Sequence, residues 1–134
     1  MNSFSNFRLQ TEILKAISEL GFESPTPIQS KTIPHLLSTN QDLIASAQTG
    51  TGKTAAFGLP SIQLAQVEDK STQTLVLCPT RELCVQIARD LADYSKYMKG
   101  IKILAIYGGA SIQPQIKSLK KGAQIVIGTP GRAK

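Results

Sequence analysis

The stretch "ASAQTGTGKT", Ala45–Thr54, joins a short apolar segment to two closely spaced glycines and a lysine. The residues Asp42–Ser46 are typical of a buried strand, and Lys53–Gln66 can form a helix. Gly50 and Gly52 let the backbone curl so that successive N–H groups point inward, and the following helix adds its positive end at the same place. The stretch therefore predicts an anion-binding loop between a strand and a helix.

The loop also matches a phosphate-binding pattern at all but one position. The pattern is G-x-x-x-x-G-K-[ST], and Ala47 stands where the first glycine is usual, although a small residue still fits there. Lys53 would reach the β- and γ-phosphates of a nucleotide, and the Thr54 hydroxyl would bind Mg²⁺, so both are candidate catalytic residues. A glycine-rich turn with a chance lysine is the weaker alternative. The candidate nucleotide-binding residues of this loop are Ala47, Gln48, Thr49, Gly50, Thr51, Gly52, Lys53 and Thr54.

Further apolar segments follow the loop, each separated from the next by a stretch that can form a helix. The expected strands are Thr74–Cys78, Lys102–Tyr107 and Gln124–Ile127, and the expected helices are Arg81–Tyr97 and Ser111–Lys120. Strand, helix and strand in this order predict parallel pairing through right-handed crossovers. The predicted fold class is therefore α/β, a parallel sheet flanked by helices. Pro60 and Pro114 are expected to kink two of these helices or to delay their start.

The residues ahead of the loop favour two helices. Apolar residues recur at helical spacing over Gln10–Leu20 and stop at Gly21, which predicts a helix with a glycine cap. Thr26 and Gln29 predict the capped start of a second helix, which Pro34 should kink or end early. We expect one domain, in which residues 1–40 form a helical region and residues 41–134 an α/β core.

Charge and cysteine usage narrow the class of protein. Lys and Arg number 15 and Asp and Glu number 9, and the resulting charge of +6 favours polyanionic partners without identifying one. Cys78 and Cys84 form neither a metal-binding set nor a disulfide framework, which indicates a reducing compartment. The longest apolar run, Ile103–Tyr107, is too short to cross a bilayer. We therefore expect a cytoplasmic protein without a membrane segment.

A set of five segments resembles, in order and spacing, the first half of a DEAD-box RNA helicase. They are GFESPTPIQ (Gly21–Gln29), AQTGTGKT (Ala47–Thr54), PTREL (Pro79–Leu83), GG (Gly108 and Gly109) and TPGR (Thr129–Arg132). The resemblance covers nearly the whole chain and implies a P-loop NTPase fold of the RecA-like type, of which residues 1–134 would be a partial N-terminal domain. It further implies ATP and Mg²⁺ as cofactors and RNA as a partner, bound through its backbone without sequence selection.

The resemblance also implies an adenine site ahead of the loop. In this family a glutamine selects adenine and an upstream aromatic ring stacks on the base, which points to Gln29 and Phe4, with Phe7 as the second choice. A side-chain amide offers one donor and one acceptor to the edge of adenine. Gln29 would also complete a capping box with Thr26, a role that needs no nucleotide. The resemblance favours the adenine role, and both roles can coexist on one amide.

RNA phosphates are expected at the carboxyl ends of the later strands. Paired glycines let a polyanion approach the main chain closely, and arginine binds phosphate. Two alternatives stay open, because Thr80 could simply cap a helix with Arg81 in solvent, and the glycines could form only a tight turn. Lys117, Lys120 and Lys121 favour a solvated helix face. The residues implied to contact RNA are Pro79, Thr80, Arg81, Gly108, Gly109, Thr129, Pro130, Gly131 and Arg132.

The acidic residues are poorly placed for hydrolysis. Hydrolysis at a P-loop needs acidic ligands for Mg²⁺ and a group that orients water, normally at the end of another strand. None of the nine acids stands at the carboxyl end of a predicted strand, and the D-E-A-D tetrad is absent. We therefore expect an N-terminal part of a helicase, truncated before the DEAD strand, lacking the second RecA-like domain and inactive in hydrolysis alone. Its unpaired strand edge could allow self-association.

Two other functions remain open from the sequence. The chain could be a stand-alone basic RNA-binding module with a vestigial nucleotide site, and RNA affinity that ignores ATP and survives Lys53→Ala would favour it. A small nucleotide kinase is disfavoured by the PTREL and TPGR segments and by the absence of an arginine-rich lid segment.

Overall fold

The computed structural model describes residues 3–48, 50, 52–108 and 111–133. These residues divide into two compact units, Met1–Leu64 with Asp93–Met98, and Ala65–Ala92 with Lys99–Lys134. The first unit thus includes the helix that follows the glycine loop, and the predicted division at residue 40 stays a prediction. Each unit is described separately below.

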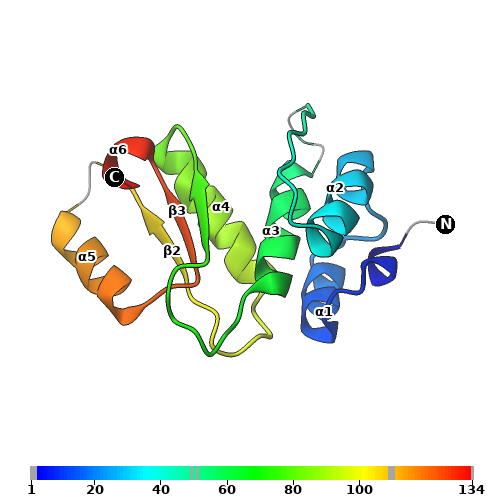
Figure 1. The fold of residues 1–134 in the computed structure, drawn as a ribbon, viewed down its shortest axis with the longest axis horizontal. Coiled ribbons are helices and arrows are strands. Elements are labelled where there is room, and N and C mark those ends of the chain that lie inside the picture. The colour runs from blue at the N-terminus through cyan, green and yellow to red at the C-terminus, as the bar shows by residue number, and fades with distance from the viewer. Residues whose placement is uncertain (1–2, 49, 51, 109–110, 134) are drawn as a thin grey trace. The chain divides into compact units, whose positions relative to one another are not determined.

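The described part of the first unit is helical. It contains the 3₁₀ turn η1 (Phe4–Phe7) and the helices α1 (Thr11–Glu19), α2 (Pro27–Ser38) and α3 (Lys53–Leu64), drawn in blue to green in Figure 1. Gly21 follows α1 with a φ of 89°, as the predicted glycine cap requires. Helices α2 and α3 pack against each other. The largest fully buried apolar side chains of this unit are Ile13, Ile17, Ile33, Leu59 and Ile62.

The start of α2 has the predicted capping box. Thr26 Oγ1 accepts a hydrogen bond from the Gln29 backbone N–H at 3.4 Å, and Gln29 Oε1 accepts one from the Thr26 N–H at 3.0 Å. Pro34 lies inside α2, so the expectation that it ends the helix early is wrong. Packing of α2 on α3 buries Ile33 completely, and such tertiary burial outweighs the local cost of a proline.

The predicted strand over Asp42–Ser46 is not formed. Within the described residues 39–48 the chain has no regular secondary structure, and Ile44 is 96% exposed. A parallel strand exists only through hydrogen bonds to a neighbouring strand, and each assigned strand belongs to the other unit. The apolar pattern of this segment is therefore not sufficient to make it a strand here.

The second unit confirms the predicted parallel sheet. Its described strands are β1 (Thr74–Leu77), β2 (Ile103–Ile106) and β3 (Ile125–Gly128), in the order β1-β3-β2. The central strand β3 is buried throughout, which explains its unbroken apolar sequence. The observed strands differ from the predicted bounds by one residue at one or both ends.

Helices connect these strands on both faces of the sheet. Helix α4 (Arg81–Tyr94) follows β1, α5 (Ile112–Lys121) joins β2 to β3, and α6 (Pro130–Ala133) follows β3. The first connection leads from β1 past the central β3 to β2, and the second leads back from β2 to β3. Right-handed crossovers in these opposite directions place α4 and α5 on opposite faces of the sheet, as Figure 1 shows. Among the described residues, no helix is long and apolar enough to cross a membrane.

A buried glutamine closes the end of the sheet where the strands begin. Gln124 is 1% exposed, and its Oε1 accepts a hydrogen bond from the Lys102 N–H at 2.8 Å. Its Nε2 donates to the carbonyl oxygens of Val67 at 3.2 Å and Gly100 at 2.9 Å. The amide thus joins the connection before β3 to the connections before β1 and β2. Its polar atoms are all hydrogen-bonded despite burial.

Candidate functional site

The two glycines of the predicted phosphate loop have positive φ angles in the first unit. Gly50 and Gly52 have φ values of 85° and 87°, a left-handed conformation that glycine adopts without steric cost. A Cβ added to Gly52 would lie 2.3 Å from Gln29 Nε2, whereas one added to Gly50 would meet no atom within 4 Å. Gly52 is therefore enclosed and Gly50 faces open space. Thr49 and Thr51 lie outside the described residues.

Gln29 connects this loop to the start of α2. The side chain is 3% exposed, and its Nε2 donates to the Gly52 carbonyl oxygen at 3.1 Å while Oε1 accepts from the Thr26 N–H. The bond to Gly52 was not foreseen from the sequence. Each end of the amide keeps capacity for one more hydrogen bond, because Nε2 has a second hydrogen and Oε1 a second lone pair. An adenine contact is thus compatible with both structural bonds.

Helix α3 begins at Lys53, directly after the loop. Lys53 is exposed, Thr54 and Ala47 are half-buried, and Gln48 is exposed. Lys53 also borders a cavity of about 610 Å³ within the first unit, whose walls are mostly apolar side chains of α2, α3 and residues 41–45.

These groups fit a bound phosphate chain. The open space beside Gly50, the amino end of a helix of 12 residues and the Lys53 ammonium favour an anion. No group of three or more His, Cys, Asp or Glu among the described residues could hold a metal ion. The Thr54 hydroxyl would be one ligand of a Mg²⁺ ion, together with phosphate oxygens and water.

The structure places the two candidate aromatic rings differently. Phe4 is 5% exposed, and its ring centroid lies 5.9 Å from that of Phe7 and 5.8 Å from that of Phe22. Phe22 in turn contacts Tyr94. Phe7 is half-buried and so has the more accessible ring. Stacking of Phe4 on a base would require this aromatic cluster to open, and the role stays a prediction.

The three strands of the second unit end in register. Leu77 of β1 and Ile106 of β2 both pair with Gly128 of β3. The ladder continues one step further, because the Cys78 N–H donates to the Gly128 carbonyl and the Thr129 N–H to the Ile106 carbonyl, each at 3.1 Å. The PTREL, GG and TPGR segments therefore leave the sheet along one edge, as the sequence predicts.

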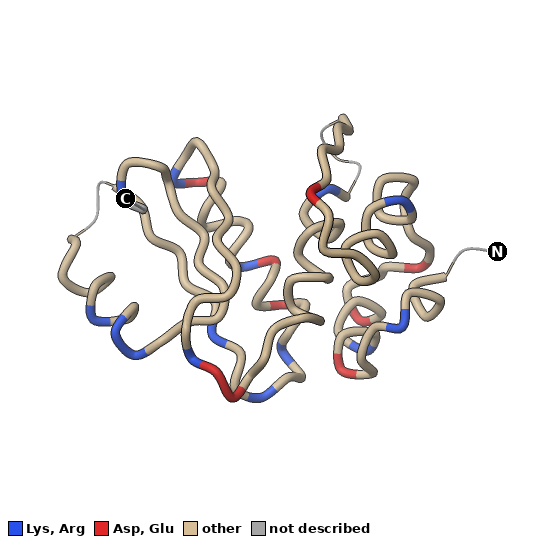
Figure 2. The backbone as a smooth tube through the Cα atoms, in the orientation of Figure 1, with Lys and Arg blue, Asp and Glu red and all other residues tan. Residues whose placement is uncertain are grey.

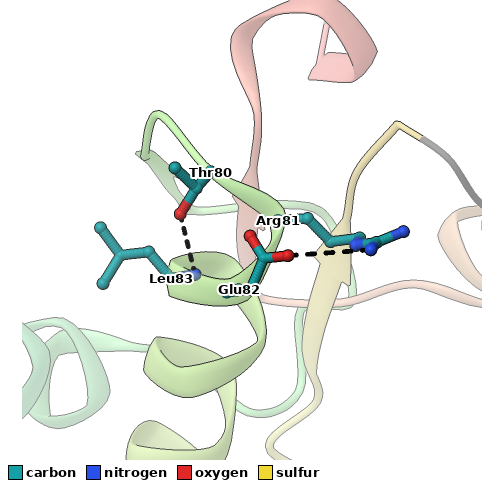
Figure 3. A network of polar contacts seen from close by, with 4 residues as sticks. All are labelled: Thr80, Arg81, Glu82 and Leu83. Carbon is teal, nitrogen blue, oxygen red and sulfur yellow. Dashed lines mark hydrogen bonds and ion pairs between the residues drawn. The ribbon is translucent and has the colours of Figure 1, made fainter.

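The PTREL segment opens α4 with a capped turn (Figure 3). The Leu83 N–H donates to Thr80 Oγ1 at 3.1 Å, and an Arg81 guanidinium nitrogen lies 3.7 Å from a Glu82 carboxylate oxygen. Both charged side chains and Pro79 are exposed. Thr80 thus fills the capping role that the sequence left open as an alternative. Its hydroxyl hydrogen is not used by the cap and can still be donated to a phosphate.

The GG and TPGR segments present backbone at the same edge. Gly108 is exposed, and a Cβ there would meet no atom within 4 Å, while Gly109 lies outside the described residues. Pro130 and Gly131 in the first turn of α6 are exposed, and Thr129 and Arg132 are half-buried. The Arg132 N–H donates to the Thr129 carbonyl at 3.1 Å. A polyanion backbone could therefore reach the main chain at Gly108 and Gly131.

Gln115 of α5 is a positioning residue that the sequence did not reveal. Its Oε1 accepts from the Tyr107 N–H at 3.2 Å, and its Nε2 donates to the Tyr107 carbonyl at 3.1 Å. The side-chain amide thus pairs with the residue after β2 as a neighbouring strand would. Only docking of α5 brings these two residues together, and spacing along the chain carries no signal for it.

The cysteines that flank PTREL form a buried thiol pair. Cys78 and Cys84 are both buried and free, with their sulfur atoms 2.7 Å apart. Burial, and next the hydrogen bond with Cys78, raise the pKa of Cys84 to about 12. Because the thiolate is the reactive species, Cys84 is inert at neutral pH.

Comparison with known proteins agrees with this arrangement. The sequence model described as "DEAD/DEAH box helicase" matches residues 26–134. The chain is 50% identical over 130 residues to the ATP-dependent RNA helicase DeaD of Escherichia coli (strain K12), covering 97% of this chain and 20% of that protein. It is 52% identical over 132 residues to the ATP-dependent RNA helicase CshA of Listeria monocytogenes, covering 98% of this chain and 25% of that protein. The chain thus spans only about a fifth to a quarter of the length of these relatives.

A solved structure is similar as well. The crystal structure of a DEAD box protein from the hyperthermophile Methanococcus jannaschii superposes with a TM-score of 0.93 at 45% identity. The match covers 99% of this chain and 36% of that one. The α/β fold described here is therefore of the same RecA-like kind, in truncated form.

Proposed function

The chain belongs to the DEAD/DEAH box helicase family, and we propose that it supplies the ATP-binding loop and one RNA-binding edge of an ATP-dependent RNA helicase. One observation supports this most directly. The register of Leu77, Gly128 and Ile106 brings three phosphate-compatible segments to a single edge of the sheet. Backbone amides, a hydroxyl and guanidinium groups along one edge suit sugar and phosphate better than base edges.

Nucleotide binding would begin with the phosphates. Lys53 and the amino end of α3 would hold them, and Thr54 Oγ1 would hold Mg²⁺, which neutralises phosphate charge when bound. The spare hydrogen and lone pair of Gln29 would select adenine, with Phe4 or Phe7 against the base. The bond from Gln29 to the Gly52 carbonyl would hold the end of the loop beside the start of α2 when the nucleotide binds.

RNA binding would follow the sheet edge. Thr80, Arg81 and Arg132 would donate to phosphates, and Gly108 and Gly131 would let the backbone approach closely. The remaining members of this surface would be Pro79, Gly109, Thr129 and Pro130. Because these contacts do not read base edges, binding would be independent of sequence and steeply dependent on salt.

A second candidate function has one observation in its favour. Both ends of the Gln29 amide are already bonded within the chain, so these structural bonds account for a glutamine at this position without any nucleotide. The chain would then be an RNA-binding module whose nucleotide loop is vestigial. RNA affinity that is unchanged by ATP and by Lys53→Ala would support this alternative.

A nucleotide titration tests the first proposal. Isothermal calorimetry with Mg²⁺ should show weak binding of ATP, weaker binding of GTP, and loss of that preference in Gln29→Ala. Lys53→Ala should lower affinity for both nucleotides, because it removes a phosphate contact and not the base contact. Equal binding of ATP and GTP, unaffected by Gln29→Ala, would remove the adenine role.

The proposed assembly has two further parts. The relatives are several times longer than this chain, so a second RecA-like domain is proposed as the partner that completes the ATP site. Leu75 and Leu77 of the outer strand β1 are more than half exposed, and we keep self-association through this strand as a prediction. Sedimentation at increasing concentration would detect it. A cytoplasmic location likewise stays a prediction.

A further inference from the structure

A second cavity, in the second unit, combines two residues of the PTREL segment with cationic, amide and aromatic groups outside the family motifs. It has a volume of about 480 Å³ and is lined by Arg81, Glu82, Val85, Gln86 and Arg89 of α4 together with Tyr107. In Figure 3 the Arg81 side chain extends from the start of α4 toward β2, the strand that ends just before Tyr107. Of these residues, only Arg81 was implicated by the sequence.

The volume and the lining suit one nucleotide. Ligand pockets of about 300 to 1,000 Å³ accept molecules of that size. Arg81, Val85 and Arg89 stand at intervals of four residues on one face of α4, so the two arginines are about 12 Å apart along the helix axis. A base could lie against Val85 and Tyr107 while the arginines meet the phosphates on either side.

Tyr107 is held in place for such a role. Gln115 binds both the N–H and the carbonyl of Tyr107, which immobilises the backbone under the ring. The side chain is half-buried, so part of the phenol remains accessible. Aromatic rings fixed in this way are the usual platforms for unstacked bases of single-stranded nucleic acid. Gly108, a member of the proposed RNA edge, is the next residue along the chain.

The charges in and around the cavity are mixed. Glu82 lies 3.7 Å from Arg81, and Gln86 Nε2 donates to Asp90 Oδ1 at 2.9 Å. The lining therefore carries two guanidinium groups and one carboxylate, with a second carboxylate, that of Asp90, about two turns further along α4. An acidic peptide would gain from the arginines but would use neither the aromatic wall nor the amide. A nucleotide uses all three kinds of group, and the amino groups of its base can donate to Glu82.

We propose that the cavity between α4 and Tyr107 binds one unstacked nucleotide of single-stranded RNA. Tyr107 stacks on the base and Arg89 binds a phosphate that the family motifs do not reach. This proposal rests on the proposed function, because it extends the same RNA edge by one nucleotide. It assigns to Arg89 and Tyr107 a part in RNA affinity.

The test is a binding titration by fluorescence anisotropy with labelled single-stranded RNA about ten nucleotides long. Tyr107→Ala should weaken binding about tenfold, whereas Tyr107→Phe, which keeps the ring, should stay within about twofold of the unmodified chain. Arg89→Ala should weaken binding and lower the slope of log K against log salt by about one. Lys121→Ala removes the same charge from the exposed end of α5 and should change much less.

A second readout isolates stacking. RNA that carries 2-aminopurine should show quenched emission in complexes with the unmodified chain and with Tyr107→Phe, because binding that is independent of sequence brings the labelled base to residue 107 in a share of the complexes. Tyr107→Ala should remove that quenching, and Arg89→Ala should keep it once binding is saturated. Far-ultraviolet circular dichroism checks that each variant is folded. If Tyr107→Ala is unfolded, the RNA affinities of Tyr107→Phe and Arg89→Ala still test the proposal.

The outcomes separate this proposal from the one it rests on. If RNA binds and Arg81→Ala weakens it while the Tyr107 and Arg89 variants do not, the nucleotide cavity is wrong and the RNA edge stands. If the unmodified chain does not bind RNA, both are wrong. Binding of a labelled polyglutamate peptide that Arg89→Ala abolishes, together with RNA affinity that the Tyr107 and Arg89 variants leave unchanged, would assign the cavity to acidic peptides and overturn the proposal.

Discussion

Gly50 and Gly52 share a backbone conformation but differ in their surroundings. Both have a left-handed φ, yet only Gly52 has a neighbour, Gln29 Nε2, where a side chain would begin. The sequence motif treats them alike as glycines of a phosphate loop. The structure shows that Gly52 is also needed for the bond between Gln29 and the loop.

We predict that Gly52→Ala destabilises the chain by about 1 to 2 kcal/mol more than Gly50→Ala. Both variants incur the cost of a left-handed alanine, but Gly52→Ala also pushes away the Gln29 amide and breaks its hydrogen bonds. Urea denaturation measures the difference. In a Gln29→Ala background the difference between the two alanine variants should shrink, because only Thr26 Oγ1, 3.2 Å from the added Cβ, then remains close. Equal effects with Gln29 present would contradict the enclosed geometry.

The buried thiol of Cys84 predicts a loss of stability at alkaline pH. The pKa of Cys84 is raised from 9.0 to about 12, so the unfolded chain releases this proton at lower pH than the folded chain does. The unfolded state then binds fewer protons between about pH 9 and 12, and by linkage the free energy of unfolding falls as pH rises through that window. Below pH 9 the contribution is fully present.

Thermal unfolding of Cys84→Ala provides the comparison. The gap in Tm between the original chain and the variant should shrink from pH 8 to pH 11, because only the original chain loses the contribution of this thiol. Tyr97 and Lys96 titrate in both proteins and cancel in the difference. Parallel pH profiles would show that burial does not protect the Cys84 proton.

Among the elements, the sheet and the capped helices agree with the sequence most closely. Short apolar runs separated by helical stretches leave few ways to pair other than in parallel, and β1, β2 and β3 do so. The capping box at Thr26 depends only on residues three apart, so local sequence suffices to predict it. Asp42–Ser46 differs because an isolated run carries no information about whether a partner strand is present.

The two hydrogen bonds between the Gln115 side chain of α5 and the backbone of Tyr107, the residue after β2, can be tested directly. We predict that Gln115→Ala lowers the free energy of unfolding by about 1 to 3 kcal/mol, because both backbone groups of Tyr107 lose their partner. Hydrogen exchange at the Tyr107 amide should accelerate. Gln113→Ala changes the same residue type at an exposed position of α5 and should do neither. Slow exchange in Gln115→Ala would mean that the strand end is held by other contacts.

At the scale of the whole molecule, the positions of the carboxylates argue against ATP hydrolysis by these 134 residues alone. The strand ends of the second unit lead to Pro79, Gly108 and Thr129, and none of the nine acidic residues stands among them. Hydrolysis needs carboxylates that bind Mg²⁺ and orient water. The relatives named as ATP-dependent RNA helicases are several times longer and so have room for them.

We therefore predict that the 134-residue chain binds ATP without hydrolysing it. Phosphate release should remain at the buffer rate with or without RNA, and Lys53→Ala should not change it. A colorimetric phosphate assay over hours is sensitive enough, since an uncatalysed phosphoanhydride is very stable. RNA-stimulated release that Lys53→Ala abolishes would show that the chain contains an acidic group whose role has been missed.

The sequence by itself determined the features that depend on neighbours along the chain. These are the parallel α/β class, the glycine cap at Gly21, the cap at Thr26 and the order of the motifs, because each follows from backbone sterics or short spacing. Only the tertiary structure decided which distant groups meet. Gln29 bonds to the Gly52 carbonyl, and Gln115 bonds to the backbone of Tyr107. The buried Gln124 side chain bonds to the Lys102 N–H. Each of these bonds joins residues from separate parts of the chain. Their partners are chosen by packing, which residue spacing does not encode.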